Sequence, residues 1–105
     1  MDRLQIYDVI RQTVQTCLPG SRILLFGSRA RGTGDHHSDY DLLIITPETF
    51  TPQEKIKWSN RLDRAIVKAI KAPIDLLLNS EEEISLKREL PGHIIQTAIK
   101  DGVAL

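Results

Sequence analysis

The sequence lacks several features that would each point to a particular class of protein. It has a single cysteine, Cys17, so no disulfide can form within the chain. No run approaches the roughly 20 consecutive apolar residues that a membrane-spanning helix needs. The segment MDRLQIYDVI at the N-terminus carries charges and lacks the unbroken apolar stretch of a secretory signal. We therefore expect a cytoplasmic protein that makes no use of a membrane.

The chain also lacks an excess of either charge, because fourteen Lys and Arg balance fourteen Asp and Glu. Proteins that bind nucleic acid usually carry a surplus of Lys and Arg. Direct binding to nucleic acid is therefore not expected, although a local basic patch stays open. A chain of 105 residues, 41% hydrophobic and 27% charged, suits one soluble domain with one core, here residues 1–105.

The first half of the chain predicts a helix followed by two strands. Apolar residues recur at helical spacing from Asp2 to Cys17, and this helix would bury Leu4 and Cys17 on its apolar face. The apolar run at 23–26 is a predicted buried strand, and residues 40–46 are a second. Between them lies the glycine-rich turn GSRARGTGDHHSD.

A third strand and two helices are predicted in the last third of the chain. The strand covers residues 74–78, and Ser80 with Glu83 forms a capping box that starts a helix. After Pro-Gly, apolar residues from Ile94 onward predict a last short helix that ends near Gly102. The order of elements indicates an α/β (α+β) domain built around a small mixed sheet.

The longest predicted helix begins at Thr51-Pro52-Gln53-Glu54, where Thr51 can cap and Pro52 fits the first helical position. It should run to about Ile70 and bury Trp58 in the core. Its opposite face carries a basic row whose role the sequence leaves undecided between a docking surface for an acidic partner or RNA and, as we favour, a solvated face. The row consists of Lys57, Arg61, Arg64, Lys68 and Lys71.

Three aspartates occupy positions that favour a metal site. Asp39 and Asp41 flank Tyr40 at the start of a strand, so their side chains share a face, with α-carbons about 6.6 Å apart. Asp75 lies inside the apolar segment PIDLLL. If its strand pairs with the Tyr40 strand, three carboxylates converge. Oxygen ligands suit Mg²⁺, with Mn²⁺ as the alternative, and a pair of ions would offset the repulsion among the acids.

The turn after the first strand has the composition of a phosphate site. Gly27 allows a phosphate to approach the backbone, and Ser28 offers a hydroxyl. If a helix begins at Ala30, its free N–H groups point at the anion, and Arg29 and Arg31 can add charge-assisted contacts. A glycine–serine turn taken alone is weak evidence for a phosphate site.

Several of these residues also have simpler interpretations. Ser38 and Asp39 can shape the start of a strand by turn chemistry alone. His36 and His37 suggest zinc, but the loop supplies no further Cys or His partner, so we favour solvated residues. The run Glu81–Glu83 suits a helix N-terminus electrostatically.

The spacing of the two motifs resembles that of a known superfamily. Gly27-Ser28 is followed by ten residues and then by Asp39-Tyr40-Asp41, which is similar to the G-S-x10-D-x-D signature of DNA polymerase β-like nucleotidyltransferases. The phrases LLFGSRARGTGDHHSDYDLLIIT and PIDLLL resemble the minimal nucleotidyltransferases (MNT proteins) of bacteria and archaea, and the similarity continues to PGHIIQTAIKDGVAL.

This resemblance implies a mixed sheet flanked by helices, a triphosphate at the Gly-Ser turn, and divalent metal bound by Asp39, Asp41 and Asp75. Asp75 would additionally help to deprotonate the attacking hydroxyl. Many MNT proteins are antitoxins paired with HEPN-domain toxins, so the resemblance implies transfer of AMP from ATP to a hydroxyl of such a toxin.

Two other functions remain open at this stage. One is a non-catalytic antitoxin that masks its partner, and the other is nucleotidyl transfer to a small molecule. The second is weakened by length, since few residues remain to build an acceptor pocket. The acceptor, the preferred base and the oligomeric state are left open by the sequence.

Overall fold

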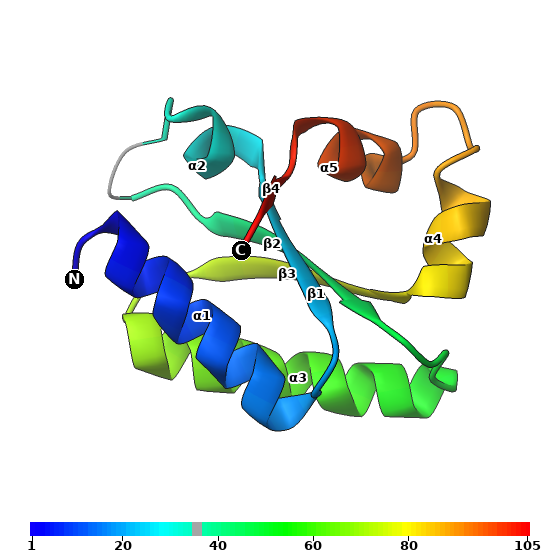
Figure 1. Ribbon diagram of the computed structural model, residues 1–105, viewed down its shortest axis with the longest axis horizontal. Helices are drawn as coiled ribbons and strands as arrows, with labels where there is room; N and C mark the ends of the chain where they lie inside the picture. The colour runs from blue at the N-terminus through cyan, green and yellow to red at the C-terminus, as the bar shows by residue number, and fades with distance from the viewer. Residues whose placement is uncertain (35–36) are drawn as a thin grey trace.

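A four-stranded sheet lies between two layers of helices in the computed structural model of the protein, which describes residues 1–34 and 37–105 (Figure 1). The expected α/β (α+β) class with a small mixed sheet is confirmed. In chain order the elements are α1 (Arg3–Cys17), β1 (Arg22–Phe26), α2 (Gly27–Arg31), β2 (Tyr40–Thr46), α3 (Pro52–Ile70), β3 (Ile74–Ser80), α4 (Glu81–Lys87), α5 (Ile94–Asp101) and β4 (Val103–Ala104).

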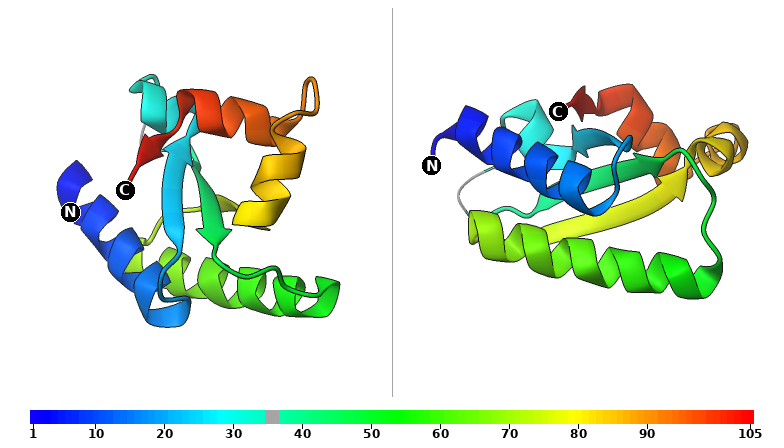
Figure 2. Two further views of the ribbon diagram at one scale, coloured as in Figure 1. Left: turned by 45° about the vertical axis from the view of Figure 1, so that its right-hand side comes forward. Right: turned by 60° about the horizontal axis from the view of Figure 1, so that its bottom comes forward.

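The strands are arranged in the order β3-β2-β1-β4. β1 runs antiparallel to both β2 and β4, whereas β3 runs parallel to β2. A parallel pair needs a long crossover, and α3 supplies it by running along one face of the sheet (Figure 2). The parallel pairing places the starts of β2 and β3 at the same end of the sheet.

Both faces of the sheet are covered, α1 and α3 on one side and α4 and α5 on the other (Figure 1). Because side chains alternate along a strand, Tyr40 and Leu42 of β2 pack toward α1 and α3, and Leu43 packs toward α4 and α5. Asp41 therefore lies on the α4–α5 face. In the part of the chain that the structure describes, no helix is both long and apolar enough to span a bilayer.

Capping boxes begin two helices where the sequence predicts them. The Thr51 hydroxyl accepts a hydrogen bond from the Glu54 amide at 3.2 Å, and the Glu54 carboxylate accepts one from the Thr51 amide at 3.0 Å. Ser80 and Glu83 make the same reciprocal pair at 3.1 and 2.9 Å. These bonds satisfy first-turn donors that would otherwise lack partners.

The ends of the regular elements differ from the prediction at three places. β3 continues past residue 78 to Ser80, whose side chain then caps α4. The short helix of the turn begins at Gly27 and not at Ala30. β4 was not expected, because two residues carry no readable hydrophobic period; pairing with Leu24 and Leu25 creates it.

Burial also differs from the prediction for two side chains of α1. Leu4 is 73% exposed, because at about 100° per residue it lies roughly 120° around the helix from Ile10, the centre of the buried face. Cys17 is half-buried and packs against the core. Trp58 of α3 is likewise half-buried with one side against the core.

Candidate active site

The Gly-Ser turn and two of the aspartates meet at one end of the sheet. In the strand register Asp41 lies opposite Phe26 of β1 on one side and opposite Asp75 of β3 on the other. Neighbouring strands are about 4.8 Å apart, so Gly27, the residue after Phe26, lies next to Asp41. The pairing that the sequence left as a condition, the strand of Asp75 beside the strand of Asp41, is present.

Gly27 contacts the Asp41 side chain so closely that no other residue type fits without rearrangement. Its φ is +73°, a left-handed conformation, and a β-carbon built there would lie 2.1 Å from Oδ2 and 3.1 Å from Cγ of Asp41. Such a distance is well inside van der Waals contact. The absent side chain at residue 27 therefore leaves the space that the Asp41 carboxylate occupies.

Electrostatic repulsion is concentrated on Asp41. Burial raises the pKa of its carboxyl above the ordinary value, the charges of Asp75 and then Asp39 raise it further, and Arg31 partly offsets them. Asp41 is half-buried, whereas Asp39 and Asp75 are exposed. All three carboxylates thus act on one region of space, and a divalent cation there would offset their mutual repulsion.

The three carboxylates fit a hard cation by their chemistry, because all donors are oxygen. They are not drawn together into a finished ligand set, since no three Asp, Glu, His or Cys side chains within residues 1–34 and 37–105 are close enough to hold a metal ion. The structure therefore brings Asp41 and Asp75 into register and keeps Asp39 within electrostatic range.

The turn after β1 is folded tightly over the end of the sheet. α2 starts at Gly27 without a side-chain cap, so side chains do not compete for the N–H groups of its first turn. The Ser28 carbonyl accepts hydrogen bonds from the amides of Thr33 at 3.0 Å and Gly34 at 3.1 Å. A β-carbon at Gly34 would lie 3.0 Å from the Ser28 hydroxyl and 3.1 Å from that of Ser38, so this glycine permits close packing.

The two arginines of α2 occupy different environments. Arg29 is half-buried, and its Nε and Nη2 donate to the Ser38 carbonyl at 3.1 and 3.0 Å. Its guanidinium also lies 4.2 Å from the centre of the Tyr40 ring. Arg31 is exposed and acts on Asp41 through its charge. The sequence predicts both arginines as nucleotide contacts. In the structure Arg29 contacts other residues of the protein, whereas Arg31 is exposed.

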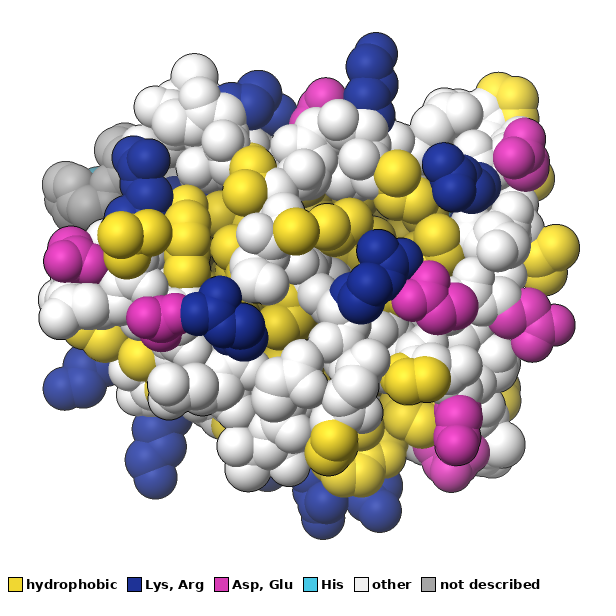
Figure 3. Space-filling model, viewed as in Figure 1, with side chains coloured by type: hydrophobic (Ala, Val, Ile, Leu, Met, Phe, Trp, Pro, Cys, Tyr) yellow, Lys and Arg dark blue, Asp and Glu magenta, His cyan; other side chains and the backbone are white. Residues whose placement is uncertain are grey.

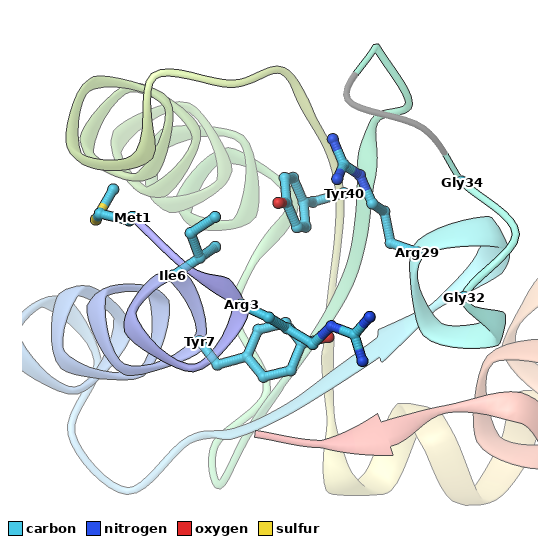
Figure 4. A pocket seen from close by; sticks show the side chains of 8 residues that line it. All are labelled: Met1, Arg3, Ile6, Tyr7, Arg29, Gly32, Gly34 and Tyr40. Carbon is cyan, nitrogen blue, oxygen red and sulfur yellow. The ribbon is translucent and has the colours of Figure 1, made fainter.

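A pocket of about 240 Å³ lies beside the turn, where side chains of α1, α2 and β2 converge (Figure 4). Arg3 and Tyr7 enter it from α1, and Arg29 stands over Tyr40 on its other side. Because Tyr40 faces α1 and α3, this pocket is behind β2 with respect to Asp41. It is therefore separate from the carboxylates.

The remaining sequence candidates lie away from this site or are not part of it. His36 falls outside the described residues; His37 is exposed. Dark-blue side chains gather along the lower edge of the molecule, where α3 runs (Figure 3). All five members of the basic row are exposed, four on α3 and Lys71 directly after it. Lys57 and Arg61 lie 5.7 and 5.2 Å from the centre of the Trp58 ring.

Sequence reasoning did not find Gly34, Ser38 or Tyr40 as parts of the site. Gly34 packs on two serine hydroxyls, while Ser38 and Tyr40 are held by Arg29. The one available signal was the strand alternation, which turns Tyr40 away from its two acidic neighbours and toward α1.

The Gly-Ser turn, Asp41 and Asp75 thus lie together at one end of the mixed sheet, and Asp39 directly precedes β2. Residues 10–104 match the family described as Polymerase beta, Nucleotidyltransferase, and the chain belongs to this family. Nucleotidyltransferases of this family use divalent metal ions.

One curated relative comes from Methanocaldococcus jannaschii and is named "Putative protein adenylyltransferase MJ0141". It is 39% identical over 59 residues, which make up 54% of this chain and 60% of the relative. The matching segment thus spans less than two thirds of the relative's length.

Two solved structures have a similar fold. A protein described as a minimal nucleotidyltransferase superposes with a TM-score of 0.69 at 21% identity, covering 100% of this chain and 97% of its own. The other is a tri-AMPylated HEPN toxin of Shewanella oneidensis in complex with its MNT antitoxin. One chain of that complex superposes with a TM-score of 0.57 at 18% identity, and the match covers 99% of this chain and 71% of that chain.

Proposed function

We propose that the protein transfers AMP from ATP to a hydroxyl group of a partner protein. The acceptor oxygen attacks the α-phosphorus, the bond from that phosphorus to the oxygen bridging the β-phosphate breaks, and pyrophosphate leaves. The proton of the acceptor passes to a nearby base, for which the resemblance to the family suggests Asp75. The observation that carries this proposal is the juxtaposition of Gly27 with Asp41 and of Asp41 with Asp75.

Asp39, Asp41 and Asp75 would hold Mg²⁺, in two sites, with Mn²⁺ as a substitute. When bound, the ions supply positive charge to the attacking and leaving oxygens of the displacement. Without them a triphosphate of charge about −4 would be repelled by three carboxylates. Gly27 and Ser28 then face the triphosphate with backbone N–H groups that no side chain caps, and Arg31 adds an exposed positive charge.

The acceptor is proposed to be a protein because of the relatives. The archaeal relative is named as a protein adenylyltransferase, and a structural neighbour is the antitoxin bound to an AMPylated HEPN toxin. We therefore infer that this chain acts in the cytoplasm as an antitoxin that modifies a HEPN toxin. A phosphodiester near an RNA-binding surface would oppose RNA by bulk and by negative charge.

The experiment combines the chain, ATP, Mg²⁺ and a HEPN toxin, and it follows the toxin by intact-mass spectrometry. The wild type should add AMP and suppress the RNase activity. Asp39→Asn and Asp41→Asn should each lower transfer by at least about a hundredfold, comparable to the loss of a major electrostatic stabiliser. Asp8→Asn removes an exposed carboxylate of α1 and should transfer at the wild-type rate.

The same assay decides between catalysis and masking. The Asp39→Asn/Asp41→Asn double variant should still bind the toxin and leave its mass unchanged. If the toxin is neutralised with no gain in mass, and the double variant neutralises it equally well, the protein is a binding antitoxin and the enzymatic proposal is wrong.

A further inference from the structure

Arg29 ties the turn of α2 to the segment that carries the first two aspartates. Nε and Nη2 of its guanidinium both donate hydrogen bonds to one oxygen, the Ser38 carbonyl, at 3.1 and 3.0 Å. Cζ of the same group lies over the Tyr40 ring, 4.2 Å from its centre (Figure 4). Ser38 and Tyr40 are the two chain neighbours of Asp39, so the contacts fix the backbone on both sides of that residue.

The restraint extends to the neighbouring strand. The Tyr40 amide donates a hydrogen bond to the Pro73 carbonyl at 3.1 Å, two residues before Asp75. Tyr40 is only 6% exposed and belongs to the core. Arg29 therefore contacts a ring that is held in the core, and this contact restrains the backbone that leads to Asp41.

We propose that Arg29 is a positioning residue, which holds Ser38 and Tyr40 so that Asp39 and Asp41 point toward the reacting phosphate. This inference rests on the proposed nucleotidyl transfer. It replaces the expectation of a nucleotide contact for Arg29 and leaves Arg31, which is exposed, as the arginine for the triphosphate.

The guanidinium shape, and not the charge alone, is what the geometry uses. A lysine ammonium is a point charge on a flexible stem and cannot place two N–H groups in one plane on one carbonyl while stacking on a ring. Arg29→Lys therefore keeps the charge and removes the restraint. A residue that only bound phosphate would be largely replaced by lysine.

The test compares Arg29→Lys with the wild type and with Arg11→Lys, which changes an exposed arginine of α1 paired with Asp8. We expect Arg29→Lys to lower kcat by about 10- to 100-fold, in line with a misplaced catalytic group. The KM for ATP should stay within about twofold, and the Mn²⁺ concentration for half-maximal activity should rise by about tenfold. Arg11→Lys should match the wild type in all three.

Hydrogen–deuterium exchange provides a readout that is independent of activity. The backbone of residues 37–43 should exchange faster in Arg29→Lys than in the wild type, while the segment 62–70 of α3 should be unchanged. Selective loss of protection at 37–43 supports positioning, and uniform loss along the chain indicates general destabilisation and overturns the inference.

The outcomes separate the two proposals. If the wild type transfers no nucleotide to any acceptor, both the proposed function and this inference are wrong. If the wild type transfers and Arg29→Lys retains its kcat, or raises only the KM for ATP, the inference alone is overturned and Arg29 is a phosphate ligand or a bystander.

Discussion

The contact between Gly27 and Asp41 makes the substitution Gly27→Ala the sharpest test of the site. The new β-carbon would meet the Asp41 side chain at 2.1 Å from Oδ2 and 3.1 Å from Cγ. The easiest relief is a rotation of the carboxylate, because the nearest atom is the end of a side chain. That rotation moves Asp41 away from the turn and changes its placement relative to Asp75.

The expected cost divides into backbone strain and displacement of the carboxylate. At a φ of +73° an alanine loses about 1–2 kcal/mol of folding free energy, which lowers the Tm of a domain of this size by about 4–15 °C. A carboxylate misplaced by about 1 Å can reduce catalysis by about a hundredfold. Gly27→Ala should therefore fold, melt somewhat earlier and transfer at about 1% of the wild-type rate or less.

Gly92→Ala is the matched control, because Gly92 has a φ of +74° and a β-carbon placed there would have no neighbouring atom within 4 Å. It carries the same backbone strain without the clash and lies in the connection between α4 and α5. Thermal melting and the AMP-transfer assay should be run on both variants. Similar melting with transfer lost in Gly27→Ala alone supports the site; transfer within about threefold of Gly92→Ala would refute the reasoning.

Three further outcomes are expected. A non-hydrolysable ATP analogue should bind in calorimetry with Mg²⁺ and only weakly with EDTA, and equal affinities would contradict a metal-bridged site. Burial raises the pKa of Glu83, but hydrogen bonds from Lys55 and the Ser80 backbone and the charges of Lys55 and Lys87 together outweigh it, so the net pKa lies below the ordinary 4.5. The Glu83 carboxylate therefore stabilises the fold above pH 4.5, and this stabilisation is lost as the pH falls below that value. Glu83→Gln should lower the free energy of unfolding in urea by about 1 kcal/mol at pH 7 and by less at pH 3. Glu82→Gln, at an exposed residue, is the control. The pKa of Asp41 is raised above the ordinary 3.8, so its charge destabilises the metal-free fold at neutral pH. The Tm of Asp41→Asn should therefore exceed that of the wild type at pH 7, and this difference should vanish below pH 3.8. A lower Tm of the variant at pH 7 would contradict the repulsion.

Much of the fold was readable from the sequence because the long elements carry strong local signals. The start of α3 at Thr51-Pro52 and the capping box of Ser80 need only neighbouring residues, so local chemistry determines them. The strand β4 depends on distant partners, since Val103 and Ala104 become a strand only by pairing with β1. A segment of two residues is too short for its sequence pattern to predict such a pairing.

The sequence indicated the neighbourhood of Gly27, Asp41 and Asp75, and it did not indicate the contacts that each residue makes. Spacing and resemblance indicated Gly27 and the three aspartates, and the register of β2 and β3 brings Asp41 and Asp75 together. The sequence treats Arg29 like any cation near a phosphate. Its two bonds to the Ser38 carbonyl depend on how the turn folds back, which no local pattern encodes.

The face on which Asp41 lies illustrates why the remaining step needs the structure. β2 is apolar on both sides, with Leu42 buried toward α1 and α3 and Leu43 buried toward α4 and α5. A strand with one polar face fixes its own register, whereas here a slip of one residue would still bury apolar side chains on both faces. It would, however, drive the Asp41 carboxylate into the core that Tyr40 now fills, at the cost of an unpaired buried charge. The Asp41 carboxylate thus favours the observed register, and Gly27 provides the space that this register requires.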